Sequence, residues 1–435
     1  MLKIFVTKLP SMIDRCFFTL VVLLNSFFLK GQEVSKAYNF ADSIIGDKRA
    51  LDLDRTSQSL CTSGHYQLGL KWEDKKYHEI DQTRVPETAR LWKQENAIDQ
   101  IVRLAKNAQI VLINEGHDLP NTRVFILKVL QELKPLGFNT YGAETFKWHD
   151  PTLKERGYPV DSSGFYTKEP VYGELVREAI KMGYDLFPYE DTVGAPIEKV
   201  ALDSFGSYML IKPDVHDTAK LIVRPDGNEF FPFKSDREIR QARNIVNYVR
   251  LHPKAKLILH VGYGHLCRDN YMMAFHLDTS LNVKMIAIDL ESLREHSDTN
   301  YEQPFYRTQN FKDYTAFADS LDKPQIPVMN NGCKIDIAVA QPRTHYINGR
   351  PDWLYKMPGR KAYATEVFNK IKAPYLLIAF YTKEYNSARQ HAIPIDVVEV
   401  KEKQSNPPLL LRKGQFTVVQ IGLRGQKEIY SIVVK

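Results

Sequence analysis

Strand-like and helix-like segments alternate along residues 96–300, and this alternation restricts the choice of folds more than any other feature of the sequence. Short segments rich in apolar residues, such as those at 110–113 and 256–261, have the length and composition of buried strands. They alternate with segments whose apolar residues recur at helical spacing, for example 237–250. Strands and helices in this order form mainly parallel sheets. We therefore predict an α/β fold, with a mainly parallel sheet and helices on both faces.

The first 31 residues have the pattern of a secretory signal peptide. Lys3, Lys8 and Arg15 precede a nearly continuous apolar run of 13 residues at 17–29. This run fits the apolar region of a signal peptide and is shorter than the ~20 residues of a membrane-spanning helix. Because Leu-Lys-Gly at 29–31 is a poor cleavage site, an uncleaved anchor stays open. We expect an extracytoplasmic protein that is periplasmic, secreted or anchored by its N-terminal segment.

A polar lead-in follows at residues 32–95. Its periodicity is weak, with alternation at 66–72 that predicts a strand and a pattern at 87–97 that predicts a helix. We expect this segment to be a lead-in or a lid in front of the main domain.

The main domain is expected to span residues 96–360. A stretch at 194–235 contains three prolines and several short apolar runs, which is typical of a lid or binding loop inserted beside a site. A further strand is expected at 336–340. Short strand-like runs separated by Pro and Gly at 361–435 predict a small antiparallel β domain at the C-terminus.

Charge and cysteine content exclude some classes of protein. A net charge of +7 on 435 residues, without a basic stripe interleaved with aromatic residues, predicts no binding of nucleic acid. Cys16 precedes the apolar run and is not placed like a lipid-anchored cysteine. Cys61, Cys267 and Cys333 lack metal-binding spacing, so one disulfide or buried thiols both stay open.

Ionisable residues follow four of the predicted strands. Glu115 and His117 come after the first strand, Glu144 after the second, Glu190 after the third and His265 after the fourth. In an open α/β sheet, ligands bind outside the carboxyl ends of the strands. Each residue alone is also explained as a helix cap or a structural residue. Together they predict a hydrolytic or metal-binding site.

The acidic residues of this group need a compensating charge, because three buried carboxylates repel one another. One candidate is a divalent metal. Two others are Arg123, which follows His117, and Arg237, which begins the helix before the HVGYGH string. Gln241 and Asn244 share the helix face of Arg237 by their spacing. An ordinary solvated helix face is the alternative explanation.

Several common catalytic motifs are absent from the sequence. It contains no GxSxG, GxxxxGK[ST], HExxH or GxGxxG string. A nucleophile-elbow hydrolase, a P-loop, a zinc metalloprotease and a dinucleotide-binding domain are therefore disfavoured.

Five motifs of the chain resemble the superfamily that joins erythromycin esterase-like proteins, ChaN-type haem-binding proteins and Tiki-type proteases. INEGHDLPNTR looks like the first motif of the family, and its Glu-x-His-Asp-x-Pro run is similar to ChaN-type members. Esterase-like members space the same pair as Glu-x-x-His, one residue longer. The resemblance covers about residues 105–290, and the motifs beyond the first are YGAE at 141–144, the run 164–175 with PYE at 188–190, RE with QA and N at 237–244, and HVGYGH at 260–265.

The resemblance implies hydrolysis with His117 as the base, and three functions follow as hypotheses. The first is an exported hydrolase that cleaves an ester, a lactone or a peptide bond, with metal assistance left open. The second is a haem- or metal-binding envelope protein of the ChaN type. The third is a non-catalytic envelope binding protein that uses the C-terminal sheet. We expect a small-molecule or peptide partner and association with the envelope. The expected catalytic residues are Glu115, His117, Glu144, Arg237 and His265; the expected substrate-binding residues are Arg123, Glu190 and Asn244; the candidate metal ligands are Glu115, His117, Glu144 and His265; and the candidate cofactors are a divalent metal or haem.

Overall fold

The computed structural model describes most of the chain beyond the predicted signal peptide. The described residues are 34–47, 52–76, 92–147, 150–190, 232–268, 272–327, 333–401 and 406–435, together with the backbone of four short strands between 200 and 230. The predicted signal peptide at 1–31 and most of the predicted insertion at 194–235 lie outside them. Among the helices that are described, none is both long and apolar enough to cross a membrane.

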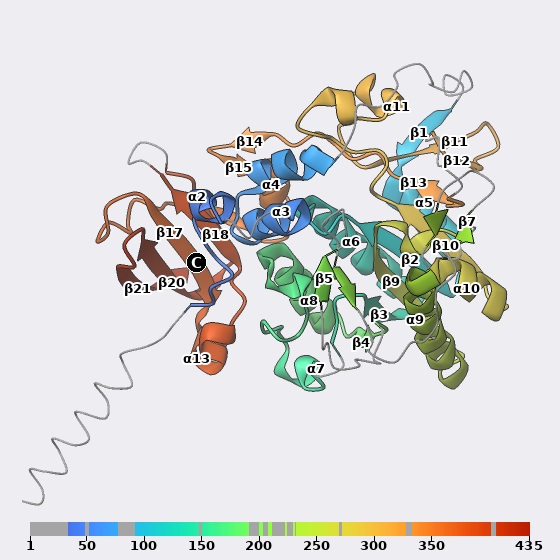
Figure 1. The fold of residues 1–435 in the computed structure, drawn as a ribbon, viewed down its shortest axis with the longest axis horizontal. Coiled ribbons are helices and arrows are strands. Elements are labelled where there is room, and N and C mark those ends of the chain that lie inside the picture. Colours follow the sequence, from blue (N-terminus) through green and yellow to red (C-terminus); the bar gives the residue numbers. More distant parts are fainter. Residues whose placement is uncertain are drawn as a thin grey trace, which may run out of the picture.

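A six-stranded parallel sheet forms the centre of the fold (Figure 1). Its strand order is β13-β10-β2-β9-β3-β4, and each neighbouring pair is parallel. This confirms the predicted α/β fold and the further strand near 336–340. The strands are β2 (Ile110–Glu115), β3 (Phe138–Ala143), β4 (Asp185–Pro188), β9 (Lys256–Gly262), β10 (Met285–Asp289) and β13 (Ile337–Ala338).

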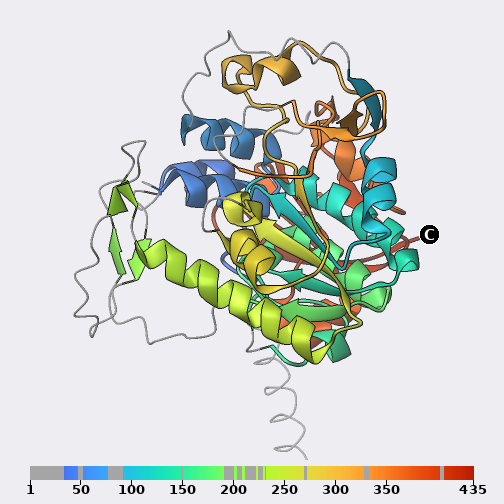
Figure 2. The same cartoon turned by 90° about the vertical axis from the view of Figure 1, so that its right-hand side faces the viewer.

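Helices cover both faces of this sheet because the strand side chains alternate in direction. Val111 and Ile113 of β2 pack in one core with α5 (Ala97–Ala105), α6 (Pro120–Leu133) and α8 (Pro170–Lys181). The intervening residues of β2 pack in a second core with α9 (Pro232–Leu251) and α10 (Met273–Ser280). Figure 2 shows α9 in yellow-green, running along its side of the sheet.

Helix ends follow local capping chemistry. Pro120 is the first residue of α6, and Leu119 holds the N-cap position without a side-chain hydrogen bond. The fixed φ of proline suits the first position of a helix. At α8 the carboxylate of Glu169 accepts a hydrogen bond from the backbone N–H of Tyr172. Helix starts in this chain therefore depend on proline as well as on polar caps.

The lead-in is helical where a strand was expected. Residues 66–72 belong to α4 (Tyr66–Glu73), so the predicted strand is wrong. The buried residues of α4 are Tyr66, Gly69 and Glu73, which recur at helical spacing, and two of them are not apolar. Of the predicted helix at 87–97, residues 87–91 lie outside the described residues, and Lys93–Asn96 forms β1, which pairs with β11.

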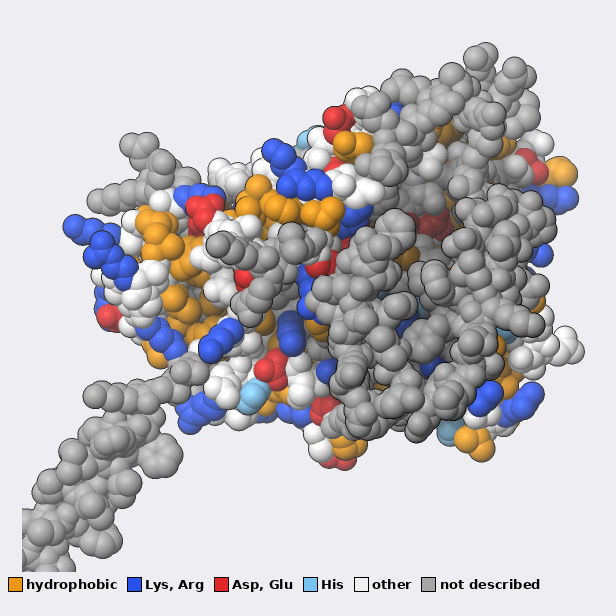
Figure 3. Space-filling model, viewed as in Figure 1, with side chains coloured by type: hydrophobic (Ala, Val, Ile, Leu, Met, Phe, Trp, Pro, Cys, Tyr) orange, Lys and Arg blue, Asp and Glu red, His pale blue; other side chains and the backbone are white. Residues whose placement is uncertain are grey.

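A four-stranded antiparallel sheet forms the C-terminal part, in the order β18-β17-β20-β21. Its strands are β17 (Tyr375–Tyr381), β18 (Asp396–Val400), β20 (Gly414–Gly422) and β21 (Lys427–Val434), and hydrophobic side chains gather over it at the left of Figure 3. Tyr38 and Phe40 of the lead-in pack into one core with this sheet. The predicted limits of the domains stay predictions.

The remaining elements are short and lie around these two sheets. They are α2 (Ala41–Ile45), α3 (Leu53–Thr62), η1 (Asp74–Lys76), η3 (Lys134–Leu136), α7 (Leu153–Arg156), η4 (Tyr166–Lys168), β5 (Val200–Leu202), β6 (Tyr208–Leu210), β7 (Ile222–Val223), β8 (Glu229–Phe230), η5 (Tyr263–Leu266), η6 (Thr299–Tyr301), α11 (Pro304–Arg307), β11 (Thr315–Ala318), β12 (Pro324–Gln325), β14 (Tyr346–Ile347), β15 (Arg350–Pro351), α12 (Asp352–Tyr355), β16 (Lys361–Tyr363), α13 (Thr382–Ala388), η7 (Arg389–His391) and β19 (Leu409–Leu411).

Cys267 and Cys333 form a disulfide, and Cys61 is a buried free thiol. The disulfide joins the end of η5 to the segment that leads into β13. Cys61 donates a hydrogen bond to the backbone carbonyl of Asp118. One of the alternatives that the cysteine count left open, a single disulfide with one thiol left over, is the one observed.

Candidate functional site

The insertion of β9 between β2 and β3 brings the predicted site residues to one rim of the sheet. In the registers of these strands Glu115 lies beside Gly262, and Ala143, which precedes Glu144, lies beside His260. Side chains at the carboxyl ends of β2, β9 and β3 therefore lie close together.

Glu115 forms the base of the site. Arg123 Nε and one terminal nitrogen donate to its two carboxylate oxygens at 2.7 and 3.1 Å. His260 Nε2 lies 2.9 Å from Glu115 Oε2. Burial alone would raise the pKa of Glu115, but Arg123 and His260 outweigh it and hold the pKa well below the usual range. Glu115 is therefore an ionised, fixed carboxylate.

Arg123 is a buried support. Besides Glu115, it donates to Glu169 at 2.9 Å and to the backbone carbonyl of His117 at 2.8 Å. Its side chain is 1% exposed. These contacts position the loop that carries His117, and the predicted substrate-binding role of Arg123 stays a prediction.

His117 is the histidine of the site that borders a cavity. Its Nδ1 lies 3.4 Å from Glu115 Oε1. Its ring stacks on Tyr166 at a centroid distance of 3.9 Å and meets the edge of Tyr263 at 5.1 Å. The cavity beside it has a volume of about 320 Å³. The imidazole is thus fixed on one nitrogen and by two aromatic contacts.

The absence of a side chain at Gly262 makes room for the centre of the site. A Cβ at this position would lie 2.7 Å from His117 Nε2 and 2.7 Å from Glu144 Oε2. The backbone N–H of Gly262 donates to Glu144 Oε2 at 2.8 Å. His117 Nε2 and the Glu144 carboxylate therefore face the same small space above β9.

Arg237 joins two of the strand-end carboxylates. It donates to Glu144 Oε1 at 2.6 Å and to both oxygens of Glu190. Burial would raise the pKa of Glu144, but His265, His117 and Arg237 hold it well below the usual range. Since Arg123 and Arg237 both pair with acids of the site, the charge compensation considered from the sequence is supplied by arginine.

The α9 residues beside Arg237 hold the end of β4. Gln241 donates to Glu190 Oε2 at 3.0 Å, and Asn244 donates to the backbone carbonyls of Tyr189 and Glu190 at 3.1 Å. Glu190 and Asn244 are therefore part of the support of the site, and their predicted contact with substrate stays a prediction.

His265 is a cation held between acids. Its Nδ1 lies 2.8 Å from Glu238 Oε2, and its Nε2 lies 3.6 Å from Glu144 Oε1. Burial alone would lower the pKa of His265, but Glu144 and Glu238 outweigh it and raise the pKa to about 10. At neutral pH His265 therefore supplies positive charge and is not a base.

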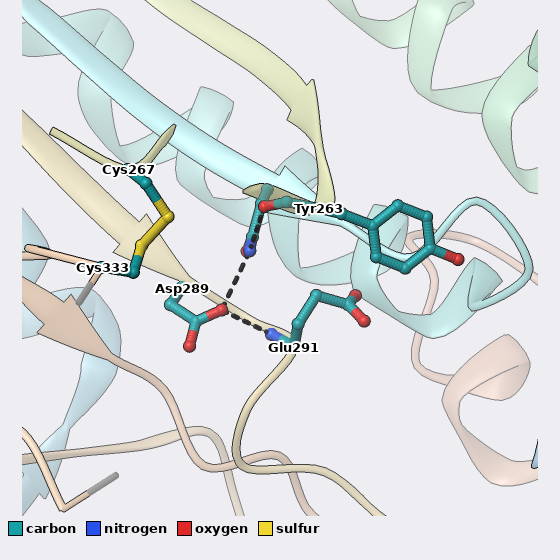
Figure 4. The surroundings of a disulfide bond; sticks show 6 residues. Tyr263, Cys267, Asp289, Glu291 and Cys333 are labelled. Carbon is teal, nitrogen blue, oxygen red and sulfur yellow. Dashed lines mark hydrogen bonds between the residues drawn. A yellow bond between two sulfur atoms is a disulfide. The ribbon is translucent and has the colours of Figure 1, made fainter. Parts of the chain in front are cut away.

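Polar contacts behind the rim hold the chain around Tyr263. Asn114 donates to the carbonyl of Tyr263 at 3.1 Å and to Asp289 Oδ1 at 2.9 Å, and Asp289 also accepts from the N–H of Glu291 (Figure 4). Tyr263 has a φ of +22°, which is unusual for a non-glycine residue. Strained residues of this kind are concentrated at functional sites.

Glu291 lies against the turn between Glu115 and His117. A Cβ on Gly116 would lie 2.8 Å from its carboxylate, which explains the glycine in the Glu-Gly-His string. Burial raises the pKa of Glu291 to about 8, although Arg294, 3.6 Å away, opposes the shift.

The predicted metal ligands do not fit a metal centre. Glu115 and Glu144 pair with arginines, and His265 has an acid or a cation at each nitrogen. Across the described ranges, no group of three or more His, Cys, Asp or Glu side chains is arranged to hold a metal ion. No step of the chemistry below is therefore assigned to a metal.

Three residues of the site were not predicted from the sequence. His260 lies between Glu115, Tyr141 and Tyr172, with its Nδ1 2.7 Å from the Tyr141 hydroxyl. The others are Glu169 and Glu238. A signal existed for His260, because it shares a strand face with Gly262 two residues later.

Comparison with known proteins gives only distant similarities. No protein-family model and no curated protein matches the chain. The type III effector HopBA1 superposes with a TM-score of 0.32 and 12% identity, over 60% of this chain and 96% of that one. ChaN of Campylobacter jejuni, described for cofacial heme binding, gives 0.28 and 12%, over 46% and 86%. The C-terminal region of Pasteurella multocida toxin, described with a thiol-protease-like triad, gives 0.29 and 8%, over 85% and 51%. Scores of this size show neither a family nor a function for this chain.

Proposed function

We propose that this protein is a hydrolase in which His117 activates a water molecule for attack on an ester, a lactone or a peptide bond. The observation that supports this most directly is the setting of His117. One ring nitrogen faces the ionised Glu115, while the other faces the space above Gly262, next to a cavity. An imidazole held in this way has the geometry of a general base.

The neighbouring charges suit this chemistry. As His117 Nε2 takes a proton from water, the imidazolium that forms is stabilised by Glu115 on one side and Glu144 on the other. The negative charge that develops on the carbonyl oxygen forms next to Arg237 and the cationic His265, which are preorganised by their own ion pairs. His117 then returns the proton to the leaving group.

Export is part of the same proposal. The predicted signal peptide motivates it, and the Cys267–Cys333 disulfide supports it, because disulfides persist mainly in oxidising compartments. Membership of the esterase-like and ChaN-type superfamily is proposed on the five sequence motifs. Envelope association follows from the export proposal and stays with it.

The experiment is turnover of a panel of activated esters, lactones and peptides by purified H117A protein. We expect a loss of at least about 100-fold, the usual scale for removal of a general base. His391 is the matched control, because it is an exposed histidine that pairs with Asp161 on another surface. H391Q should retain full activity. Equal turnover by H117A and the unchanged protein removes the proposal.

Haem binding is the second candidate, and the aromatic setting of His117 favours it. Of the three histidines at the rim, His260 and His265 are committed to other polar side chains, whereas His117 Nε2 has no hydrogen-bond partner within the described residues. Tyr166 and Tyr263 flank its ring. A Soret band on haem addition that is unchanged in H117A would rule out this ligand.

A further inference from the structure

The cavity beside His117 is walled by the lead-in. Helix α3 contributes polar and basic side chains, and the segment 165–168, which includes η4, contributes aromatic and basic ones. Its volume of about 320 Å³ is at the lower end for small-molecule pockets. Its lining includes Arg55, Gln58, Ser59, Phe165 and Lys168.

A second hollow of about 340 Å³ adjoins the first and shares Ala37, Arg55 and Ser59 with it. Lys36 and Asn39 also line the second hollow and do not line the first. The two hollows together provide space for a ligand that reaches from His117 past Arg55. Amide and hydroxyl groups line both hollows and can form hydrogen bonds with a polar ligand that extends through them.

The charges around these hollows favour an anion. Arg123 and Glu169 both line the first hollow but neutralise each other at 2.9 Å. No ion pair joins Lys168 to a carboxylate within the described part of the chain; its ammonium lies 5.8 Å from the centre of the Phe165 ring. Arg55 is held by Asp52 at 3.3 Å.

The charges that line the second hollow also favour an anion. Lys36 lines the second hollow, and Asp47 is its single acidic lining residue. With the Arg123–Glu169 and Arg55–Asp52 pairs set aside, two lysines, Lys36 and Lys168, and one acid, Asp47, line the two hollows. A carboxylate in this space forms charge-assisted hydrogen bonds, which are stronger than neutral ones.

We propose that the substrate carries a carboxylate, which binds between Lys168 and Arg55 while the bond to be cleaved lies at His117. This inference rests on the proposed hydrolase function and names its substrate class. The lead-in is then a specificity element, since its α3 supplies one of the two cations.

The kinetic test compares two 4-nitrophenyl esters with the same leaving group, the neutral butyrate and the anionic hemiglutarate. We expect the unchanged protein to favour the hemiglutarate in kcat/KM. In K168Q the ratio of the two kcat/KM values should fall about tenfold, which corresponds to the loss of one charged contact of about 1.4 kcal/mol. R55Q should lower the same ratio.

Lys370 provides the matched control. It is a surface lysine that pairs with Glu428 on the C-terminal sheet and lines neither hollow. The ratio in K370Q should equal that of the unchanged protein. A ratio that is the same in K168Q, R55Q and the unchanged protein overturns the inference even if both esters are hydrolysed.

A binding test separates this inference from the hydrolase proposal. If neither ester is hydrolysed, titration of glutarate into the full protein by calorimetry decides. Binding that weakens about tenfold in K168Q and is unchanged in K370Q supports the carboxylate site while the hydrolase proposal fails. No binding of glutarate to the unchanged protein, or equal binding by K168Q, overturns the inference.

Discussion

Gly262 controls the geometry of the candidate site at the scale of a single residue. Its φ of −83° and ψ of 152° are accessible to any residue, so an alanine strains no backbone here. The added Cβ would instead lie 2.6 Å from His117 Cε1 and 2.7 Å from Glu144 Oε2. We expect G262A to fold and to lose activity by about 100-fold, because displacements near 1 Å have that effect. Ester turnover and a thermal melt measure the two quantities.

Gly264 is the control for this substitution, two residues further along. A Cβ there would meet only Met272 Cε at 3.4 Å. G264A should keep both activity and stability. If G262A were as active as G264A, the space above Gly262 would not be the reaction centre.

His265 gives a prediction for the pH dependence of stability. Its pKa rises from 6.5 to about 10 on folding, so its contribution to stability is complete below pH 6.5 and is lost as the pH rises toward 10. Substitution by glutamine removes this contribution. The difference in free energy of unfolding between the unchanged protein and H265Q should therefore be larger at pH 6.5 than at pH 9.5. Urea titrations at both values measure it, and a constant difference would contradict the assigned charge.

The sequence predicted Glu115 and His117 as site residues but did not predict Glu238 and Glu169, and the difference has a physical reason. Glu115 and His117 are two residues apart, and local spacing is enough to place them near each other. Glu238 reaches His265 from another element, and Glu169 reaches Arg123 from the start of α8. Such contacts depend on helix packing, which no local spacing reveals.

At the scale of elements, the disulfide holds η5 to the segment before β13. It joins positions 66 residues apart in sequence, and η5 carries His265. Closing a long loop restricts the unfolded chain, so we expect its removal to lower the free energy of unfolding by about 2–4 kcal/mol. Urea unfolding of C267A/C333A measures this loss. Dithiothreitol should destabilise the unchanged protein and leave the double variant unaffected; equal effects on both would contradict the assignment.

Element types were predicted well where the periodicity was apolar and poorly where it was mixed. Strands β2 and β9 are rich in apolar residues, and α9 has apolar residues at helical spacing; these three elements were predicted, whereas α10 was not. Helix α4 buries Gly69 and Glu73 along with Tyr66, so its inward face does not look hydrophobic. The order of the strands was not predictable either, because β9 lies between β2 and β3 in the sheet although it follows both of them in the sequence.

At the scale of the whole molecule, buried ion pairs connect the α/β part to the C-terminal sheet. The side chains of Arg177 on α8 and Glu384 on α13 are 8% and 10% exposed, and their charged groups approach to 2.6 Å. Arg177 also donates to the backbone carbonyl of Ile393 at 2.8 Å. The lead-in adds Tyr38 and Phe40 to the core of the same sheet. Short strand-like runs predicted a small C-terminal β domain. The long-range pairs that join it to the α/β part cannot be predicted from local sequence patterns.

Because the Arg177–Glu384 pair joins two parts of the molecule, we expect loss of its carboxylate to lower the stability of the whole fold. In E384Q a neutral amide replaces the carboxylate that pairs with the buried Arg177. The carboxylate of Glu174 is a weaker partner, because it lies 3.6 Å from the Arg177 guanidinium. We expect the free energy of unfolding to fall by about 3–5 kcal/mol, the scale for removing one partner of a buried ion pair. E428Q is the matched control on the same sheet, because the Lys370–Glu428 pair is exposed and screened by solvent. Urea unfolding should show a single transition at lower denaturant for E384Q and no shift for E428Q. A separate early transition in E384Q would mean that the C-terminal sheet unfolds independently of the α/β part.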